Sequence, residues 1–512
     1  MKNAERVIKF KNIIGYGITD LFGMGSLAVV GAWMLYFYTT FCGLSPVEAG
    51  AIFAVARIID ALISPLMGYI TDNFGSTRLG KKFGRRRFFI LLGIPFVACY
   101  SLLFVAGMSF WYYLFSYIIL EITLALVMVP YETLAAEMTK DFSTRSKLAG
   151  SRMLFSQSAV FIASILPGRL MQIFGENTAI SFFYTAAVFS VIFVIALITV
   201  YFSTWETEEE KVDVSFKVEK LSLLENVKKV LAELSSTFRI KTFRHHLAIY
   251  IFSFTSMDIF IAVFTYYIVF ALHQTSVLSS NLLTIMSVSQ VAAVAGTIWL
   301  VVKIGPASCV KIASLLSIVS IIGYVSVYGL APENIFPYLM AICIVMGLSR
   351  GAATFIPWNV YSFIPDVDEM VTTRRREGIF AGVMTFSRKT TVAVAIFIVG
   401  NILQMGGFVA GAKEQSLTTV NTVLGLMIVG VIGLQLMTLV YAFRFKLSKQ
   451  RHDIILDEIN RLKAGGSMEH AGDSTRKTVE ELTGWKYEET WGNNNVGYKV
   501  NAQSAKSVSE TL

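Results

Sequence analysis

Residues 55–68 read VARIIDALISPLMG, so an arginine and an aspartate stand three residues apart inside a long apolar run. The run extends over residues 47–71, and about 20 such residues are enough for a helix to cross the hydrocarbon core of a bilayer. A charged side chain in lipid is costly unless it faces a partner or a water-filled cavity. We therefore predict a membrane-spanning helix whose charged side chains point into the protein.

Eleven further runs have a similar length and apolar character. Because each could cross the bilayer once as a helix, the sequence predicts twelve spans. Six of them precede the polar stretch 204–246, and six precede the polar tail 445–512. The spans are expected near residues 13–41, 47–71, 87–108, 111–136, 149–173, 179–203, 247–272, 279–302, 308–330, 336–363, 378–404 and 420–444.

The pattern of six plus six predicts an all-α integral membrane protein built from two six-helix bundles, over residues 1–203 and 247–444. Residues 204–246 are predicted to form a cytoplasmic central loop. Apolar residues recur every three or four positions from Leu221 to Leu234, which indicates an amphipathic helix at the membrane surface.

The tail over residues 445–512 is predicted to be cytoplasmic and partly disordered. Its first part carries aliphatic residues at helical spacing, from Ile454 to Leu462. Past Gly465 the sequence becomes polar and poor in aliphatic residues, which is typical of disorder.

The composition excludes several classes of protein. Hydrophobic residues make up 54% of the 512 and charged residues only 15%, whereas a soluble domain carries about a quarter charged residues. The four cysteines and five histidines show no metal-ligand spacing, so we expect no metal and no bound cofactor. We find no Walker A, GxSxG or HExxH motif, which argues against an ATP-driven pump and a membrane enzyme. A sensor would need a soluble output domain, and we predict none of sizeable length after the last span.

The net charge of +9 is explained by membrane topology rather than by nucleic acid, for which we expect no role. Lysine and arginine gather in the turns after the second, fourth and tenth spans, whereas only Arg169 and Lys413 lie near the opposite face. Basic residues favour the cytoplasmic side. We therefore expect a multi-pass protein of the cell inner membrane, monomeric in the lipid bilayer, with both termini in the cytoplasm.

The two halves carry traces of an internal repeat. Residues 149–156 in the fifth span and 381–387 in the eleventh share small residues and aromatics in the same order. The fourth span contains Pro130-Tyr131-Glu132, and the tenth contains Pro357-Trp358-Asn359. Matching motifs in matching helices favour a duplicated transporter. We expect each proline to interrupt its helix, so that the side chains after it face a cavity.

Several ionisable residues lie inside the predicted spans. Arg57 and Asp60 share one face of the second span and could neutralise each other, either as a structural pair that locks helix packing or as a cation-coupling site. Glu121 and Glu132 lie about three turns apart on one face of the fourth span. Asp258 in the seventh span is opposite in charge to Arg388 and Lys389, which are adjacent in the eleventh span, and could pair with them. The full set is Asp20, Arg57, Asp60, Glu121, Glu132, Arg152, Asp258, Arg350, Arg388 and Lys389.

Aromatic rings beside charged and amide groups suit a polyhydroxylated ligand. The C–H faces of a sugar pack on aromatic rings, and its hydroxyls bond to arginine and carboxylate groups. We predict substrate binding by Asp20, Tyr131, Glu132, Arg152, Trp358, Asn359, Thr385 and Lys389, and cation coupling by Asp60 and Arg57.

These segments resemble the glycoside–pentoside–hexuronide:cation symporters, the branch of the major facilitator superfamily that includes the melibiose permease. The resemblance is carried by Gly43-Leu44-Ser45, by residues 56–72, by Val129-Pro130-Tyr131-Glu132, and by Arg375-Arg376-Glu377-Gly378-Ile379 with Lys389 beyond. It extends from about residue 10 to about residue 445. The resemblance implies the major facilitator fold and symport of a sugar with a cation.

The chain departs from the pattern of the sodium-using members. They carry two aspartates in the second span, D-x-x-x-D-P, whereas here Asp60 is followed by Ser64. Two further family carboxylates align with Met24 and Met128, while the family arginine and lysine are retained as Arg152 and Lys389. The resemblance implies that Ser64 belongs to the cation-coupling site together with Asp60 and Arg57. The carboxylates missing at Ser64 and Met128 favour a proton over sodium as the co-transported cation, with Asp60 as carrier and Glu132 second.

The sequence therefore predicts a secondary active transporter that imports a glycoside or uronate-type sugar with a cation, a proton rather than sodium. The lost carboxylates, the retained cations and the additional Arg388 favour an acidic sugar, and a neutral glycoside remains an alternative. A carrier of lysolipids or other amphiphiles with the same fold is the second possibility. A membrane-embedded sensor or enzyme is the third.

Overall fold

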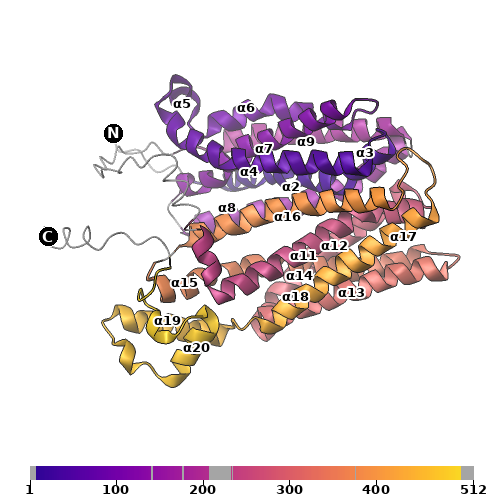
Figure 1. Cartoon of the computed structure of the whole chain (residues 1–512). Coiled ribbons are helices and arrows are strands. Elements are labelled where there is room, and N and C mark those ends of the chain that lie inside the picture. The colour runs from indigo at the N-terminus through magenta and orange to yellow at the C-terminus, as the bar shows by residue number, and fades with distance from the viewer. Residues whose placement is uncertain are drawn as a thin grey trace.

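The computed structural model describes residues 7–139, 142–175, 178–206, 232, 234–374 and 376–496. This part of the chain contains helices and no strand, and twelve helical spans are long and apolar enough to cross a membrane. The predicted number and order of spans is confirmed. Figure 1 shows the spans in two groups, with the first half of the chain on one side and the second half on the other.

The first half contains the first six spans, of which the first is broken into four segments and the rest are single helices apart from a short 3-10 extension. Their bounds are α1 (Phe10–Gly17), α2 (Asp20–Val29), the π-helical η1 (Val30–Met34) and α3 (Leu35–Thr40), then α4 (Pro46–Asn73), α6 (Arg87–Ala98) with η3 (Cys99–Phe104), α7 (Phe110–Met138), α8 (Phe142–Phe174) and α9 (Ala179–Ser203). Between α4 and α6 lie η2 (Phe74–Ser76) and the short α5 (Arg78–Phe83).

The second half repeats this arrangement. Its bounds are η4 (Thr237–Arg239), α11 (Lys241–Tyr266) with η5 (Tyr267–Ala271), α12 (Ser276–Ile304), α13 (Pro306–Leu330), α14 (Phe336–Tyr361), α15 (Ile364–Thr372), α16 (Glu377–Met405), and α17 (Leu417–Gly425) with η6 (Leu426–Ile432) and α18 (Gly433–Arg444).

The start of α4 follows directly from its sequence. Ser45 caps the helix, its hydroxyl accepting from the Glu48 backbone N–H at 3.2 Å, while the Glu48 carboxylate accepts from the Ser45 N–H at 2.9 Å. Pro46 occupies the first helical position, where no N–H is needed.

By contrast, the expected interruptions at Pro130 and Pro357 are absent, since α7 and α14 continue through both prolines.

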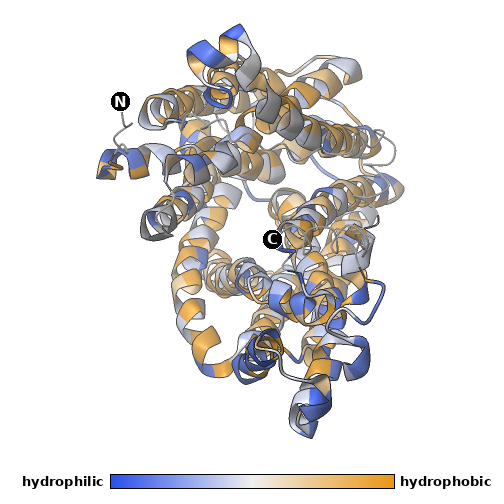
Figure 2. Cartoon of the chain, turned by 90° about the vertical axis from the view of Figure 1, so that its left-hand side faces the viewer, coloured by the Kyte–Doolittle hydropathy of each residue, from blue (hydrophilic) through white to orange (hydrophobic). Residues whose placement is uncertain are grey.

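The two halves touch through α4 against α16 and α8 against α12. The closest approach is at Gly400, where a methyl group would lie 2.3 Å from the Pro46 carbonyl oxygen. The Thr39 and Tyr266 hydroxyls, from the first and seventh spans, are 2.6 Å apart. At the opposite ends of α8 and α16, a methyl group on Gly150 or Gly378 would meet nothing within 4 Å. The halves therefore meet at the end away from the chain termini (Figure 1). Figure 2 is viewed from the end that carries the termini and shows mostly hydrophobic helices with hydrophilic residues in several of the segments that connect or extend them.

The tail forms a small folded subdomain, and the prediction of disorder past Gly465 is wrong for residues 466–496. It consists of α19 (Lys449–Lys463), η7 (Met468–His470), α20 (Asp473–Thr483) and η8 (Tyr487–Glu489). Its apolar residues pack with those of α15 and the start of α11 in one cluster, which includes Ile455, Ile459, Leu462, Val479, Leu482, Tyr487, Val367 and Met370. The polar composition of the tail suggested disorder. Its few apolar side chains are nevertheless buried, because they pack against apolar residues of the membrane domain.

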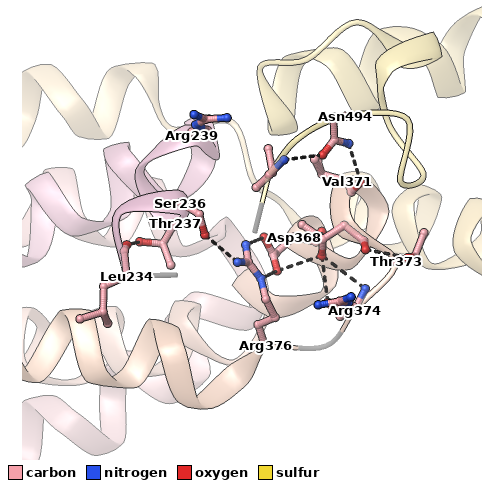
Figure 3. Close-up of polar contacts among 12 residues, drawn as sticks. Leu234, Ser236, Thr237, Arg239, Asp368, Val371, Thr373, Arg374, Arg376 and Asn494 are labelled. Atoms are coloured by element: carbon pink, nitrogen blue, oxygen red, sulfur yellow. Dashed lines mark hydrogen bonds and ion pairs between the residues drawn. The ribbon is translucent and has the colours of Figure 1, made fainter. Parts of the chain in front are cut away.

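Backbone hydrogen bonds fix the end of this subdomain to α15. The Trp491 N–H donates to the Met370 carbonyl at 2.8 Å, and the Gly492 N–H donates to the Val371 carbonyl at 2.9 Å. Figure 3 shows a neighbouring ion pair, in which Arg376 donates hydrogen bonds to both carboxylate oxygens of Asp368 at 2.6 and 2.8 Å. The tail subdomain therefore packs directly against the second half. The predicted amphipathic helix of the central loop lies outside the described residues, except for its last part.

Candidate functional site

Arg152 in α8 links carboxylates from two other helices of the first half. Its Nε donates to Asp20 Oδ2 at 2.9 Å, and its terminal nitrogen donates to Glu132 Oε1 at 2.8 Å. The Asp20 side chain is 2% exposed and that of Glu132 is 54% exposed. The arginine therefore bridges a buried carboxylate and an exposed one. A ligand could reach the open end of this cluster, at Glu132.

The break between α1 and α2 brings Asp20 to this position. Gly17 at the end of α1 packs against α8, where a methyl group would lie 2.2 Å from Ser151 Oγ. The Ser151 hydroxyl in turn donates to the Ile13 carbonyl at 2.8 Å. This close approach places the start of α2, with Asp20 as its first residue, beside Arg152.

Tyr131 belongs to the same cluster, yet it is fully buried. Its hydroxyl donates to the Tyr16 carbonyl at 2.9 Å, and the two rings stack with centroids 4.6 Å apart. The Arg152 guanidinium lies 5.4 Å from the centroid of the Tyr131 ring. In this conformation Tyr131 supports Arg152 and does not offer its ring to a ligand, because the ring is buried against Tyr16.

A second cluster joins the two halves. Lys389 in α16 lies 2.7 Å from Asp60 Oδ2 in α4 and donates to the Ser64 hydroxyl at 2.7 Å. Ser64 donates to the other oxygen, Asp60 Oδ1, at 2.9 Å. Three residues predicted from the sequence as coupling or binding groups are thus in direct contact, and both oxygens of Asp60 are bonded.

Arg57 is bonded elsewhere, which corrects the expected pairing with Asp60. Its terminal nitrogen contacts Glu121 Oε2 in α7 at 3.3 Å. The helical spacing put Arg57 and Asp60 on one face correctly, but neighbouring helices supply each with a different partner. Sequence spacing within one helix could not reveal this exchange, since Glu121 lies 64 residues away.

A third cluster lies within the second half. Arg388 in α16 holds both carboxylate oxygens of Asp258 in α11, at 2.5 and 2.8 Å. The opposite charges noted in the sequence therefore do meet, and Arg388 is not an unpaired cation. Arg350 in α14 donates to Gln290 Oε1 at 3.3 Å, and among the described residues no carboxylate forms an ion pair with it.

The remaining predicted residues lie on the second half. Trp358 is partly exposed and packs edge-on against Tyr250 of α11, with ring centroids 5.9 Å apart. Asn359 is half-buried, and Thr385 is exposed one turn before Lys389. No hydrogen bond joins these three side chains to the Arg152 cluster in the part of the chain that the structure describes. Tyr250, which the sequence reasoning missed, supports Trp358.

The fold and the paired charges between and within its halves define an integral membrane transporter. The family described as MFS/sugar transport protein matches residues 15–449, and the chain belongs to that family. Its members are transporters and not enzymes, which confirms the resemblance found in the sequence.

Individual relatives agree with this assignment. The chain is 21% identical to a glucuronide carrier protein homolog of Escherichia coli, covering 89% of this chain and 96% of the relative. It is 24% identical to the isoprimeverose transporter of Lactiplantibacillus pentosus, covering 88% and 92%. It is also 25% identical to a putative glycoside/cation symporter of Escherichia coli, covering 89% and 96%.

Solved structures support the fold alone, because their sequence identities are low. A bacterial homolog of the human lysosomal transporter Spinster, in an inward-facing and unoccupied conformation, has a TM-score of 0.56 at 13% identity, covering 86% of this chain and 96% of that one. The structure of tetrameric PepTSo2 has a TM-score of 0.58 at 12% identity, covering 89% of this chain and 100% of that one.

Proposed function

We propose that this protein is a proton-coupled symporter that carries a sugar or glycoside into the cytoplasm. The observation that supports the proposal most is the Lys389–Asp60–Ser64 cluster, which joins α16 to α4 across the two halves. Alternating access requires the halves to move against each other. A titratable group inside such a contact can make that movement depend on protonation.

The bonds that Asp60 already makes favour a proton over sodium as the co-transported cation. A sodium ion needs several oxygen ligands, and both oxygens of this carboxylate are already bonded to Lys389 and Ser64. Two carboxylates of the pattern found in sodium-using members are replaced by Ser64 and Met128.

The orientation proposed from the charge distribution is an inner-membrane protein with both termini in the cytoplasm. The halves meet at the end away from the termini, so under this proposal the structure is inward-facing. The open end of the Arg152 cluster at Glu132 then lies on the route to the cytoplasm.

The substrate is proposed to be a sugar or glycoside that bonds to Arg152 and Glu132 and packs on Trp358. The argument for an acidic sugar loses one support, because Arg388 is neutralised by Asp258. It keeps another, because Lys389 would become available to a substrate carboxylate if it left Asp60. A uronate-type substrate is therefore the narrower proposal.

Uptake by proteoliposomes tests the proposal. Purified protein would be reconstituted and offered radiolabelled glucuronate, an aryl β-glucuronide, an aryl β-xyloside or a lysophospholipid, with an imposed proton or sodium gradient. We expect uptake of at least one sugar to rise with the proton gradient alone. Sodium-driven uptake without a response to protons would contradict the coupling, and lysophospholipid as the sole substrate would favour the amphiphile carrier.

A further inference from the structure

Glu121 is a buried carboxylate whose charge is poorly compensated. Its side chain is 1% exposed, and its contact with Arg57 is long at 3.3 Å. The other oxygen, Oε1, has no partner that meets hydrogen-bond geometry among the described residues, and the same holds for the buried hydroxyl of Tyr117 one turn earlier, although the Tyr117 hydroxyl and the Glu121 carboxylate act on each other. An ionised carboxylate inside a membrane protein that leaves one oxygen unbonded is unfavourable, whereas its protonated form can donate a hydrogen bond.

Asp60 presents the opposite situation one helix away. Its two oxygens receive a short contact from the Lys389 ammonium at 2.7 Å and a hydrogen bond from Ser64 at 2.9 Å. Bonds to charged groups of this kind stabilise the ionised form. Of the two carboxylates, Glu121 therefore has the less compensated charge in this conformation.

We propose that Glu121 is the proton-binding group of this protein and that its protonation transfers Arg57 from Glu121 to Asp60. For its link to transport, the proposal rests on the proposed proton-coupled symport. It replaces Asp60 and Glu132, the two carriers that the sequence favoured.

The geometry of α4 makes the transfer short. Arg57 and Asp60 are three residues apart in one helix, and side chains at this spacing are neighbours on the helix surface. The charges of Asp60 and Asp258 already act on Arg57, in addition to that of Glu121. When a proton from water binds Glu121, Arg57 loses its closest negative partner, and Asp60 is the carboxylate beside it on the same face.

The transfer would then act on the contact between the halves. Asp60 paired with Arg57 holds Lys389 less strongly, so α16 can separate from α4 at this point. The charged and titratable groups around Glu121 are Arg57 and Asp60 from α4, Tyr117 from its own helix and Lys389 from α16. The four charged groups Arg57, Lys389, Asp60 and Glu121 sum to zero when Glu121 is ionised and to +1 when it is protonated. An anionic sugar would restore neutrality, which links proton binding to a uronate-type substrate.

Infrared difference spectroscopy of the purified full-length protein tests the proton site without any substrate. The probe is the C=O stretching band of a protonated buried carboxyl group, followed from alkaline to acidic pH. We expect this band in the native protein, its loss in Glu121→Gln, and its retention in Asp60→Asn. Glu48→Gln, at the exposed first turn of α4, makes the same change at an exposed site, serves as the control and should keep the band. Gel filtration and thermal unfolding would establish that each variant is folded.

Persistence of the band in Glu121→Gln, its loss in Asp60→Asn instead, or its absence from the native protein would each overturn the proposal. A transport measurement then separates it from the proposed function. In proteoliposomes, Glu121→Gln should keep sugar exchange at equal pH on both sides but lose the increase caused by a proton gradient. If the native protein itself showed no such increase, the proposed symport would fail, whereas the infrared result for Glu121 would stand.

Discussion

Lys389 Nζ lies 2.7 Å from Asp60 Oδ2, and these two residues come from opposite halves of the protein, 329 positions apart in the sequence. The pair is largely shielded from solvent, and Ser64 bonds to both partners. Breaking such a pair by removing one partner leaves an uncompensated buried charge. The contact is therefore both a tie between α4 and α16 and a point where a change of charge can release them.

A charge-removal series tests this tie. Lys389→Gln leaves Asp60 ionised with Ser64 as its remaining partner, and we expect a loss of stability of up to about 3 kcal/mol. The double variant Asp60→Asn/Lys389→Gln should recover most of that loss, because no charge remains buried. Thermal unfolding in detergent measures both, with Lys446→Gln at the exposed pair with Glu481 as control. Additive losses in the double variant would contradict the coupling.

The Arg152 cluster predicts a strict requirement for arginine. Its planar guanidinium bonds to Asp20 and Glu132 at the same time, and a lysine ammonium cannot reproduce that fork. We expect Arg152→Lys to weaken sugar binding about tenfold or more, since a bond to a charged group contributes roughly 1.5–3 kcal/mol. Competition binding measures the effect. Arg169→Lys is the same change on an exposed part of α8 and should leave affinity unchanged.

Gly400 predicts how the halves can be forced apart. In Gly400→Ala the new methyl group would lie 2.3 Å from the Pro46 carbonyl oxygen, so α16 could not remain against α4 at that end. We expect the population to shift toward a state open at that end. Maleimide labelling of the native Cys42, in a Cys99→Ser background, should become faster. Gly433→Ala, where a methyl group meets nothing within 4 Å, is the control, and equal labelling in both variants would refute the role of this contact.

The tail subdomain should be sensitive to acid. Hydrogen bonds from Arg461, at 2.7 and 2.9 Å, together with one from Tyr487, hold the pKa of Glu458 below its usual value, while burial raises the pKa of Tyr487 to about 12. A carboxylate with a lowered pKa in the folded state stabilises that state above its unfolded pKa. This stabilisation is lost as the pH falls through the folded pKa. We expect the subdomain to loosen in acid, well below neutral pH.

Fluorescence of Trp485 measures that loosening, as the difference between the native protein and Trp485→Phe. Glu458→Gln should remove most of the acid response because it cannot ionise. Glu488→Gln changes an exposed partner of Arg476 and should keep the response. An unchanged acid transition in Glu458→Gln would show that other groups control it.

Competition between matched sugars tests the narrower substrate proposal. We expect an aryl glucuronide to displace bound sugar better than the matching neutral glucoside, because a released Lys389 can bond to a carboxylate. The preference should disappear in Lys389→Gln. Equal displacement by both sugars in the native protein, with Arg152→Ala weakening both equally, would remove the acidic sugar from consideration.

Hydropathy and charge were sufficient for the architecture. Apolar runs of about 20 residues can only satisfy their backbone in lipid as helices, so twelve spans and two halves follow directly from the sequence. Rules that consider one segment at a time were less successful. They failed at Pro130 and Pro357, where neighbouring helices tolerate the proline within a continuous helix, and in the tail, where a docking surface on α15 orders a polar segment.

The sequence by itself determined which charged residues lie inside the membrane, because each is an ionisable side chain within an apolar run. Only the tertiary structure decided their partners. Asp60 and Arg57 share one face of α4, yet Asp60 bonds to Lys389 and Arg57 to Glu121. Spacing fixes neighbours along one helix, whereas the partner of a buried charge depends on which other helix packs against that face, and this is set by side-chain packing between segments far apart in the chain.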